Sequence, residues 1–278
     1  PDRKKMSKSK GNVVVPNDLI EVYGADAVRY WAASARLGSD TANDEQIFKV
    51  GKKLVVKLFN ASKFVLNGSP EYINVSDITE PLDLSTVHLF NEYLDEITES
   101  MENFQFSEAL NKLEDFFWNY FTDNYIELVK NRSKFNDYGH KTISGLTTLR
   151  LILENLLKLF APFIPMVTEE IWGWIYRNNS SNYKSIHLEK WPEKINLDFK
   201  NINSSQLVIA REAIGAVRKE KTNEGLSLGS DLNNVSLSVN KQVEGTLRDV
   251  IDDVKDAARS QSIEINIGSN EGVRASID

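Results

Sequence analysis

The chain has 278 residues, a charged fraction of 26% and a formal net charge of −7. This balance excludes a general, sequence-independent nucleic-acid binder, whose affinity depends on a broad excess of lysine and arginine, but it permits a local basic stripe. The sequence has no cysteine and three scattered histidines, which excludes disulfides and cysteine metal sites and leads us to predict no metal site.

The first dozen residues are basic and rich in hydroxyl groups, and they show no apolar periodicity. Lysines on flexible stems can follow the charge of a polyphosphate, and serine hydroxyls add hydrogen bonds to it. The stretch therefore fits a phosphate-binding loop, and its composition also fits a solvated terminal tail. In this candidate loop, Lys5 and Lys8 supply the charges, Ser7 and Ser9 supply the hydroxyls, and Met6 fits an apolar anchor.

Beyond this stretch, apolar residues recur at helical spacing as far as residue 176. The predicted elements are two short helices joined at Gly24, long helices from Asp44 to Gly68, from near Ser85, from Ser107 and from about Ser144, and a shorter helix over 168–176. Because their apolar faces are continuous, we predict one shared core. The fold class is therefore mainly α, an antiparallel helix bundle of about four to five members.

After a polar linker at 178–183, the sequence pattern changes from long helical repeats to alternating helix and strand signals. The predicted elements there are a short strand or extended segment at 186–188, a helix over 206–222, a strand over 235–239, a helix over 243–259, a strand over 263–267 and a mobile tail. Alternating helices and strands predict a small α/β or α+β module. The expected domains are 1–44, 45–178 and 185–278.

The order of residues in two blocks resembles class I aminoacyl-tRNA synthetases. Lys5–Ser9 matches the signature loop of that family, and the segments Gly11–Val14 and Tyr23–Trp31 follow as they do in it. Within the family, residues 31–45 and 57–65 resemble the valyl enzymes most, and the isoleucyl enzymes are the nearest alternative. The resemblance covers about residues 3–192, with a departure at Val15, where the family usually has an acid.

The resemblance implies that Lys5, Met6, Ser7, Lys8 and Ser9 bind the triphosphate of ATP, with Mg²⁺, during amino-acid activation. Lys8 and Lys5 are then the catalytic residues, because their charges stabilise the developing pyrophosphate. None of the three histidines lies in a His-x-Gly-His segment, the other half of such a site. We therefore expect a fragment with no ATP–pyrophosphate exchange and no cofactor of its own, and we expect residues 1–12 to be disordered or held by crystal contacts.

The implied partners are tRNA-Val, together with valine and ATP through the missing catalytic domain. We expect a cytoplasmic monomer without a membrane segment, because the longest apolar stretch is too short to span one. The alternatives are an isoleucyl-type fragment or a stand-alone tRNA-binding module of synthetase origin.

The family's helical domain binds the tRNA anticodon, and recognition of unstacked bases needs aromatic faces and cations. The first bundle helix offers this mixture on one face, at Lys49, Lys53, Lys57, Asn60 and Phe64. These residues also fit an ordinary solvated face. Arg132, with Lys130 and Lys134, is a second candidate for tRNA contact, and the alternative is a charge that complements a helix C-terminus.

Two acidic pairs, Glu169–Glu170 and Asp252–Asp253, invite a metal or acid/base interpretation. Adjacent residues point in different directions on a helix, so neither pair can converge on one ion. We predict that both pairs lie on the solvated surface.

Overall fold

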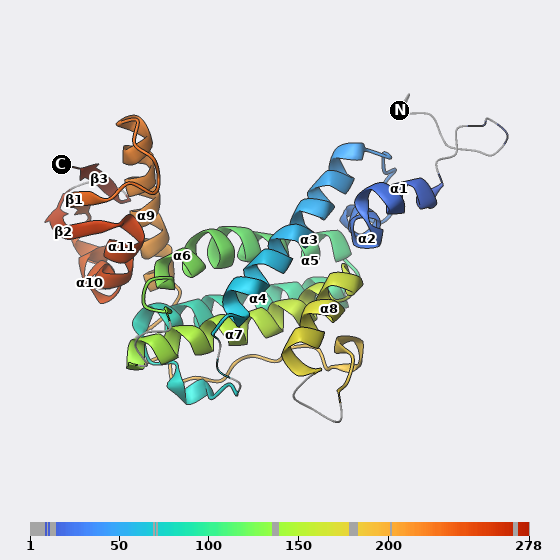
Figure 1. Ribbon diagram of the computed structural model, residues 1–278, viewed down its shortest axis with the longest axis horizontal. Helices are drawn as coiled ribbons and strands as arrows, with labels where there is room; N and C mark the ends of the chain where they lie inside the picture. The colour runs from blue at the N-terminus through green and yellow to red at the C-terminus, as the bar shows by residue number, and fades with distance from the viewer. Residues whose placement is uncertain are drawn as a thin grey trace. The chain divides into compact units, whose positions relative to one another are not determined.

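The computed structural model describes residues 9, 11, 15–68, 70, 72–134, 139–177, 183–200, 202–268 and 272–277. Helices make up most of these residues, and a three-stranded sheet lies near the C-terminus (Figure 1). The predicted fold class, mainly α with a small α/β or α+β module, is confirmed. Among the described helices, none combines the length and the apolar character needed to cross a membrane.

The chain folds as two compact units, each assembled from separated segments. Unit 1 takes in residues 1–67, 93–115 and 153–194, and unit 2 takes in 68–92, 116–152 and 195–278. Helices α4 (Pro81–Glu102) and α7 (His140–Phe160) contribute residues to both. The predicted division into domains 1–44, 45–178 and 185–278 stays a prediction. The two compact units follow a different division, since each combines segments from more than one of these ranges.

The elements that the structure describes in unit 1 are all helices or helical turns. Besides parts of α4 and α7 it contains α1 (Pro16–Tyr23), α2 (Ala25–Ser34), α3 (Glu45–Leu66), α5 (Phe106–Asp115), α8 (Pro165–Tyr176) and the 3₁₀ turn η4 (Ile186–Leu188). The two short helices predicted around Gly24 and the long helix after them are confirmed. Asp44 caps α3 by accepting a hydrogen bond from the backbone N–H of Gln46 at 2.9 Å.

Helix α2 packs closely against α3 and anchors to α8. Gly51 permits the first contact, because a Cβ at that position would come within 2.8 Å of the Tyr30 ring. The buried carboxylate of Asp26 accepts hydrogen bonds from the N–H groups of Met166 and Val167, at 3.0 and 2.8 Å, in the first turn of α8. Asp26 thus caps α8 from another helix.

The segment 186–188, predicted as a short strand or extended segment, is the 3₁₀ turn η4 instead. Ser185 caps this turn by accepting a hydrogen bond from the His187 N–H. The carboxylate of Glu169 accepts from the Tyr183 hydroxyl at 2.6 Å, the Ser185 hydroxyl at 2.8 Å and the Ile186 N–H at 3.0 Å. Glu169 is therefore not simply a solvated residue as predicted, because it organises this segment.

Unit 2 combines helices with the sheet. Its elements, besides parts of α4 and α7, are the 3₁₀ turn η2 (Val75–Asp77), η3 (Phe116–Tyr125), α6 (Ile126–Val129), α9 (Ser205–Asn223), β1 (Leu232–Val239), α10 (Lys241–Asp249), α11 (Ile251–Ala258), β2 (Ser260–Ile267) and β3 (Arg274–Ile277). The single helix predicted over 243–259 is divided at Val250. This residue has a non-helical φ of −121° and lies between the end of α10 and the start of α11. The predicted tail contains β3.

Part of the helix predicted from Ser107 is π-helical. It comprises α5 and then η3, a π-helix in which Phe117, Phe121 and Tyr125 are buried. Asn124 supports this wider backbone, because its side-chain amide donates to the carbonyl of Asn119 at 2.7 Å. A π-turn leaves carbonyls offset from their usual donors, so a buried amide that reaches one of them stabilises it.

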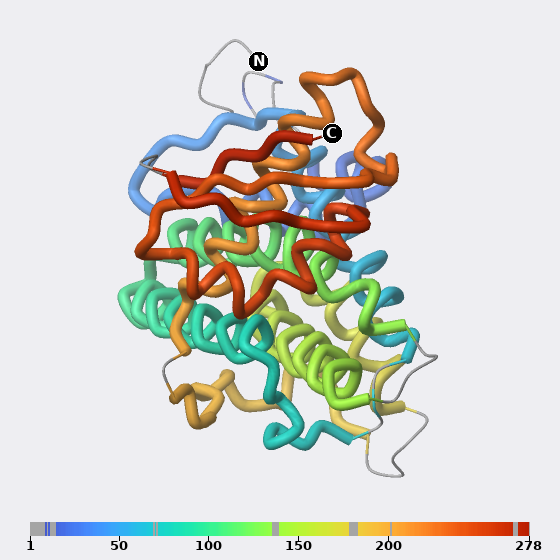
Figure 2. The backbone as a smooth tube through the Cα atoms, turned by 90° about the vertical axis from the view of Figure 1, so that its left-hand side faces the viewer, coloured from blue at the N-terminus to red at the C-terminus, as the bar shows by residue number. Residues whose placement is uncertain are grey.

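The sheet has the order β2-β1-β3, and Figure 2 shows β1 between its two neighbours. β1 pairs in parallel with β2, Val235 opposite Ile263, and antiparallel with β3, Val235 opposite Ile277. The apolar residues of β1 are buried. Lys221 of α9 is buried as well, and its ammonium donates to the carbonyls of Leu228, Ser230 and Ala258 at 2.7 to 3.2 Å.

Candidate nucleic-acid interface

The five residues predicted on the first bundle helix share one face of α3. We call Lys49, Lys53, Lys57, Asn60 and Phe64 the α3 basic stripe. Four of them are exposed and Lys57 is half-buried, whereas Phe48, Leu54 and Leu58 on the other side of the helix are buried. The apolar side fixes the rotation of α3 in unit 1, so the stripe faces solvent.

One lysine of the stripe forms an ion pair whose acidic partner a phosphate could replace. The ammonium of Lys49 lies 3.2 Å from the carboxylate of Glu45, and both side chains are more than half exposed. An exposed ion pair contributes little net free energy, so a phosphate can replace Glu45 at small cost. Near the end of the stripe, Phe64 is 37% exposed, and aromatic side chains on such surfaces can stack on nucleic-acid bases.

One more cation borders the stripe. Lys63 is exposed, and its ammonium lies 4.5 Å from the centre of the Phe59 ring. That ring packs edge-on against Trp174 of α8 at 4.9 Å. Our selection from the sequence missed Lys63, although its spacing of four residues from an aromatic was the signal that could have found it.

The end of helix α1 contacts α3. The Tyr23 hydroxyl donates to the carboxylate of Glu45, and the Tyr23 ring stacks on Phe48 at 5.6 Å. Lys52 donates to the carbonyl of Val22 at 3.0 Å, which places a cation at the end of α1. Of the predicted phosphate-binding residues, Ser9 is exposed, whereas Lys5, Met6, Ser7 and Lys8 lie outside the described residues, as does most of the expectation for residues 1–12.

Arg132 lies in a buried ion-pair network of unit 2, and its side chain is 10% exposed. Its Nη1 donates to Asp83 at 3.0 Å, its Nε donates to Asp253 at 2.6 Å, and its Nη1 also reaches the carbonyl of Lys141 at 2.7 Å. The prediction that Arg132 contacts tRNA conflicts with this placement, because its donors are already used inside the protein. We assign it to the fold.

Three neighbours hold the Asp83 carboxylate, which is fully buried. Besides Arg132, the hydroxyls of Tyr125 and Ser144 donate to it at 2.7 and 2.6 Å. Burial works against the charge of Arg132, but the nearby carboxylates of Asp83 and Asp253 outweigh it and raise the pKa of the guanidinium. Burial also raises the pKa of Asp253 to about 6, with a further contribution from Asp83. The prediction that the Asp252–Asp253 pair is solvated is therefore wrong for Asp253.

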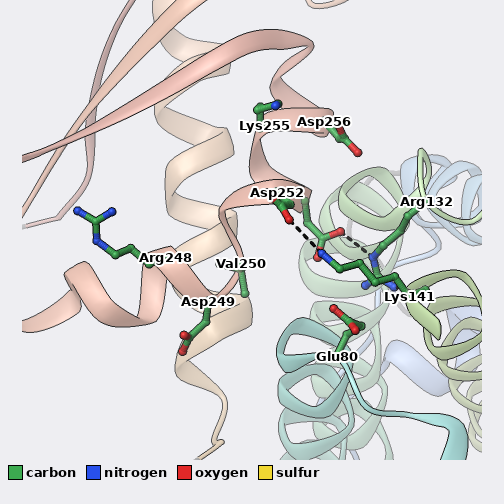
Figure 3. Close-up of a pocket in the computed structure, with 10 residues that line it drawn as sticks. Glu80, Arg132, Lys141, Arg248, Asp249, Val250, Asp252, Lys255 and Asp256 are labelled. Carbon is green, nitrogen blue, oxygen red and sulfur yellow. Dashed lines mark hydrogen bonds and ion pairs between the residues drawn. The ribbon is translucent and has the colours of Figure 1, made fainter. Parts of the chain in front are cut away.

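A small pocket of unit 2 opens beside this network (Figure 3). Its volume is about 260 Å³, and acidic and basic side chains line it together. Asp252 points toward Lys141, and the two charges lie 3.0 Å apart. No group of three or more His, Cys, Asp or Glu side chains suited to a metal ion occurs among the residues that the structure describes.

Comparison with protein families gives two matches. The model described as the anticodon-binding domain of tRNA ligase matches residues 83–237, and the model described as tRNA synthetases class I (I, L, M and V) matches residues 1–44. Helix α3 lies between these two ranges.

Similar curated proteins are valine–tRNA ligases. The chain is 39% identical to that of Tropheryma whipplei over 284 residues, 95% of this chain and 31% of that protein. It is 41% identical to that of Thermobifida fusca over 248 residues, 88% and 27% of the two chains, and 47% identical to that of Cutibacterium acnes over 194 residues, 69% and 21%. The chain thus spans about a third or less of the length of these relatives.

A solved structure shares the fold. The LeuRS of Agrobacterium radiobacter, described as a ternary complex of LeuRS, tRNA and LeuAMS, superposes with a TM-score of 0.51 at 21% identity, over 69% of this chain and 22% of that one. The match to the anticodon-binding model over residues 83–237 covers more than half of the chain, and it shows that the chain belongs to the family of the anticodon-binding domain of tRNA ligases.

Proposed function

We propose that this chain is the tRNA-binding part of a class I valine–tRNA ligase, and that it holds the anticodon region of tRNA-Val through the α3 basic stripe. The observation that carries this proposal is the stripe itself, two exposed lysines and the half-buried Lys57 with an adjoining aromatic residue, on a helix whose other side is buried. Cations contact the RNA backbone, and an aromatic ring stacks on an unpaired base.

The N-terminal loop has a separate role in this proposal. In the whole protein, Lys5 and Lys8 bind the phosphates of ATP, which Mg²⁺ accompanies, and stabilise the charge of the departing pyrophosphate. Valine specificity is supported by the three relatives described above, each of which is named a valine–tRNA ligase. A monomeric state and a cytoplasmic location stay predictions.

The test is a binding titration of the chain with a tRNA-Val transcript, compared with the variant in which Lys53→Ala and Lys57→Ala are combined. We expect about a 10-fold or greater loss of affinity at low salt, and a salt dependence that is weaker by about one to two phosphate contacts. The matched control combines Lys219→Ala and Lys241→Ala, which removes the same charge from exposed positions of unit 2. A tRNA-Ile transcript tests the choice of amino acid.

Equal losses in the two double variants would show that net charge, and not the stripe, governs binding. Equal affinity for tRNA-Val and tRNA-Ile would remove the valine assignment from this chain. Binding of wild-type protein that is unchanged between low and high salt would contradict a phosphate-contacting stripe, because counterion release accompanies every such contact.

A further inference from the structure

The turn between α4 and α5 has an unusual backbone. Phe104 has a φ of 57°, and Phe104 and Arg259 are the non-glycine residues with positive φ among those that the structure describes. The Phe104 N–H donates to the carbonyl of Met101 at 3.1 Å, and the Gln105 N–H donates to that of Ser100 at 2.8 Å. These two bonds define a Schellman cap, whose left-handed position glycine normally occupies because it has no Cβ.

Arg259 has a structural reason for this conformation. Its Nε donates to Asp231 at 2.8 Å, and its carbonyl accepts from the N–H of Leu232 at 2.9 Å, so it fixes the start of β1 against the end of α11. Phe104 lacks such a reason. Phe104 is 69% exposed, and its one ring contact among the described residues is a T-shaped contact with Phe106, with the ring centres 6.1 Å apart.

Phe104 is therefore unfavourable twice, as a bulky residue in a left-handed conformation and as an exposed apolar ring. Strain that a fold retains without a packing benefit points to a function. The two flanking side chains, Asn103 and Gln105, are exposed and make no hydrogen bond with the residues that the structure describes. Amides can donate to and accept from a base edge, and an aromatic ring can stack on its face.

The charges around the turn restrict what can approach it. Glu99, Glu102 and Glu108 are exposed nearby in the sequence on α4 and α5, and Lys112 lies 3.1 Å from Glu108. These carboxylates repel phosphates, so the turn suits the uncharged part of a nucleotide better than its backbone. The turn and the α3 basic stripe both belong to unit 1, so one compact body carries them.

We propose that the Asn103–Gln105 turn binds an unstacked base of the tRNA, with Phe104 stacking on the base and the flanking amides contacting its edge. This rests on the proposed tRNA-binding function and adds a second base-binding position to the α3 basic stripe, whose lysines contact phosphates.

The test replaces Phe104 by glycine, which removes the ring and also the backbone strain. We expect Phe104→Gly to bind the tRNA-Val transcript about 5- to 100-fold more weakly, with an unchanged salt dependence, because a stacking contact involves no phosphate. Its melting temperature should be equal to or higher than that of the wild type. Phe104→Tyr keeps the ring and should keep the affinity. Tyr72→Ala, at another exposed aromatic, is the control.

The two proposals fail in different ways. If Phe104→Gly binds like the wild type while the combined Lys53 and Lys57 variant is weakened, the turn has no base-binding role and the proposed function stands. If neither the wild type nor any variant binds tRNA, the proposed function fails, and the base-binding turn fails with it. A loss of affinity in Phe104→Gly that comes with a lower melting temperature, or an equal loss in Tyr72→Ala, would also overturn the base-binding turn.

Discussion

Arg132 brings one positive charge to two carboxylates that are almost fully removed from water. Asp83 receives two guanidinium contacts and two hydroxyls, whereas Asp253 receives a single donor from Arg132. Asp83 is therefore the better stabilised of the two acids. Two carboxylates with one guanidinium leave an excess of negative charge when all three groups are ionised. This excess contributes to the raised pKa of Asp253.

Removing Arg132 leaves Asp83 buried without its counter-ion. We expect Arg132→Met to lower the free energy of unfolding by about 3–5 kcal/mol, the usual cost of breaking a buried pair from one side. Urea denaturation measures this loss. Lys130→Met is the control, because Lys130 is half exposed and pairs with Glu127 at the surface. A stable Arg132→Met protein with weakened tRNA binding would restore Arg132 to the RNA surface.

The pH dependence follows from the raised pKa of Asp253, about 6 against an ordinary 3.8. The folded state then binds this proton at a pH where the unfolded state does not. Stability contributed by Asp253 is therefore lowest above pH 6 and rises as the pH falls toward 4. At 1.36 kcal/mol for each pH unit, the gain is at most about 3 kcal/mol.

Urea denaturation of the wild type and of Asp253→Asn between pH 7.5 and pH 4.5 measures this gain. The wild type should gain stability relative to Asp253→Asn as the pH falls, because the amide cannot titrate. Asp252→Asn, at a side chain that is 76% exposed, should follow the wild type. Parallel curves for the wild type and Asp253→Asn would contradict a raised pKa.

Single residues also mark the limit of what the sequence could predict about the site. The α3 basic stripe could be found, because helical periodicity alone decides which side chains share a face. The ion pairs of Arg132 could not be predicted, because its partners Asp83 and Asp253 lie 49 and 121 residues away along the chain. Burial of Lys221 could not be predicted either, because it depends on carbonyls in the loop after α9 and on that of Ala258, which lies 37 residues away along the chain.

At the scale of elements, α8 depends on a cap from another helix. Pro165 begins the helix, and no side chain next to it in sequence caps it. The carboxylate of Asp26 accepts from the N–H groups of Met166 and Val167 instead. This contact fastens α2 to the start of α8, so its loss affects two helices.

We expect Asp26→Ala to cost about 1–2 kcal/mol of unfolding free energy, the upper part of the range for a lost cap, because the freed N–H groups are partly buried. Asp26→Asn keeps an acceptor and should lose less. Asp18→Ala, in the exposed first turn of α1, is the control for removing an acidic residue near a helix start. Equal unfolding midpoints for Asp26→Ala and Asp18→Ala would contradict the capping role.

The elements that the sequence predicted are those with a strong local pattern. The long helices α3 and α7 carry apolar residues at steady spacing, and β1 alternates them. The π-helix η3 was missed, because a run of aromatic residues fits both helix types and the wider turn depends on packing. β3 was missed because four residues carry too weak a pattern, and its pairing with β1 is a non-local contact.

At the scale of the whole molecule, a formal charge of −7 opposes any approach to RNA. The α3 basic stripe is a local exception, and its three lysines suffice for about three phosphate contacts. Each contact contributes a slope of about 0.7 to 0.9 in a plot of log affinity against log salt concentration. The acidic remainder of the surface adds no such contacts and disfavours non-specific binding.

We therefore expect a salt slope of about 2–3 for the tRNA-Val transcript between 50 and 200 mM salt, measured by fluorescence titration. A duplex DNA of similar length should bind much more weakly at every salt concentration, because it offers phosphates but no unstacked bases to Phe64 or Phe104. A slope of about 6 or more would require a broad basic surface, which the net charge makes unfavourable, and it would place the binding surface beyond α3. Equal affinity for the duplex would show that the aromatic rings contribute nothing and that charge alone attracts the RNA.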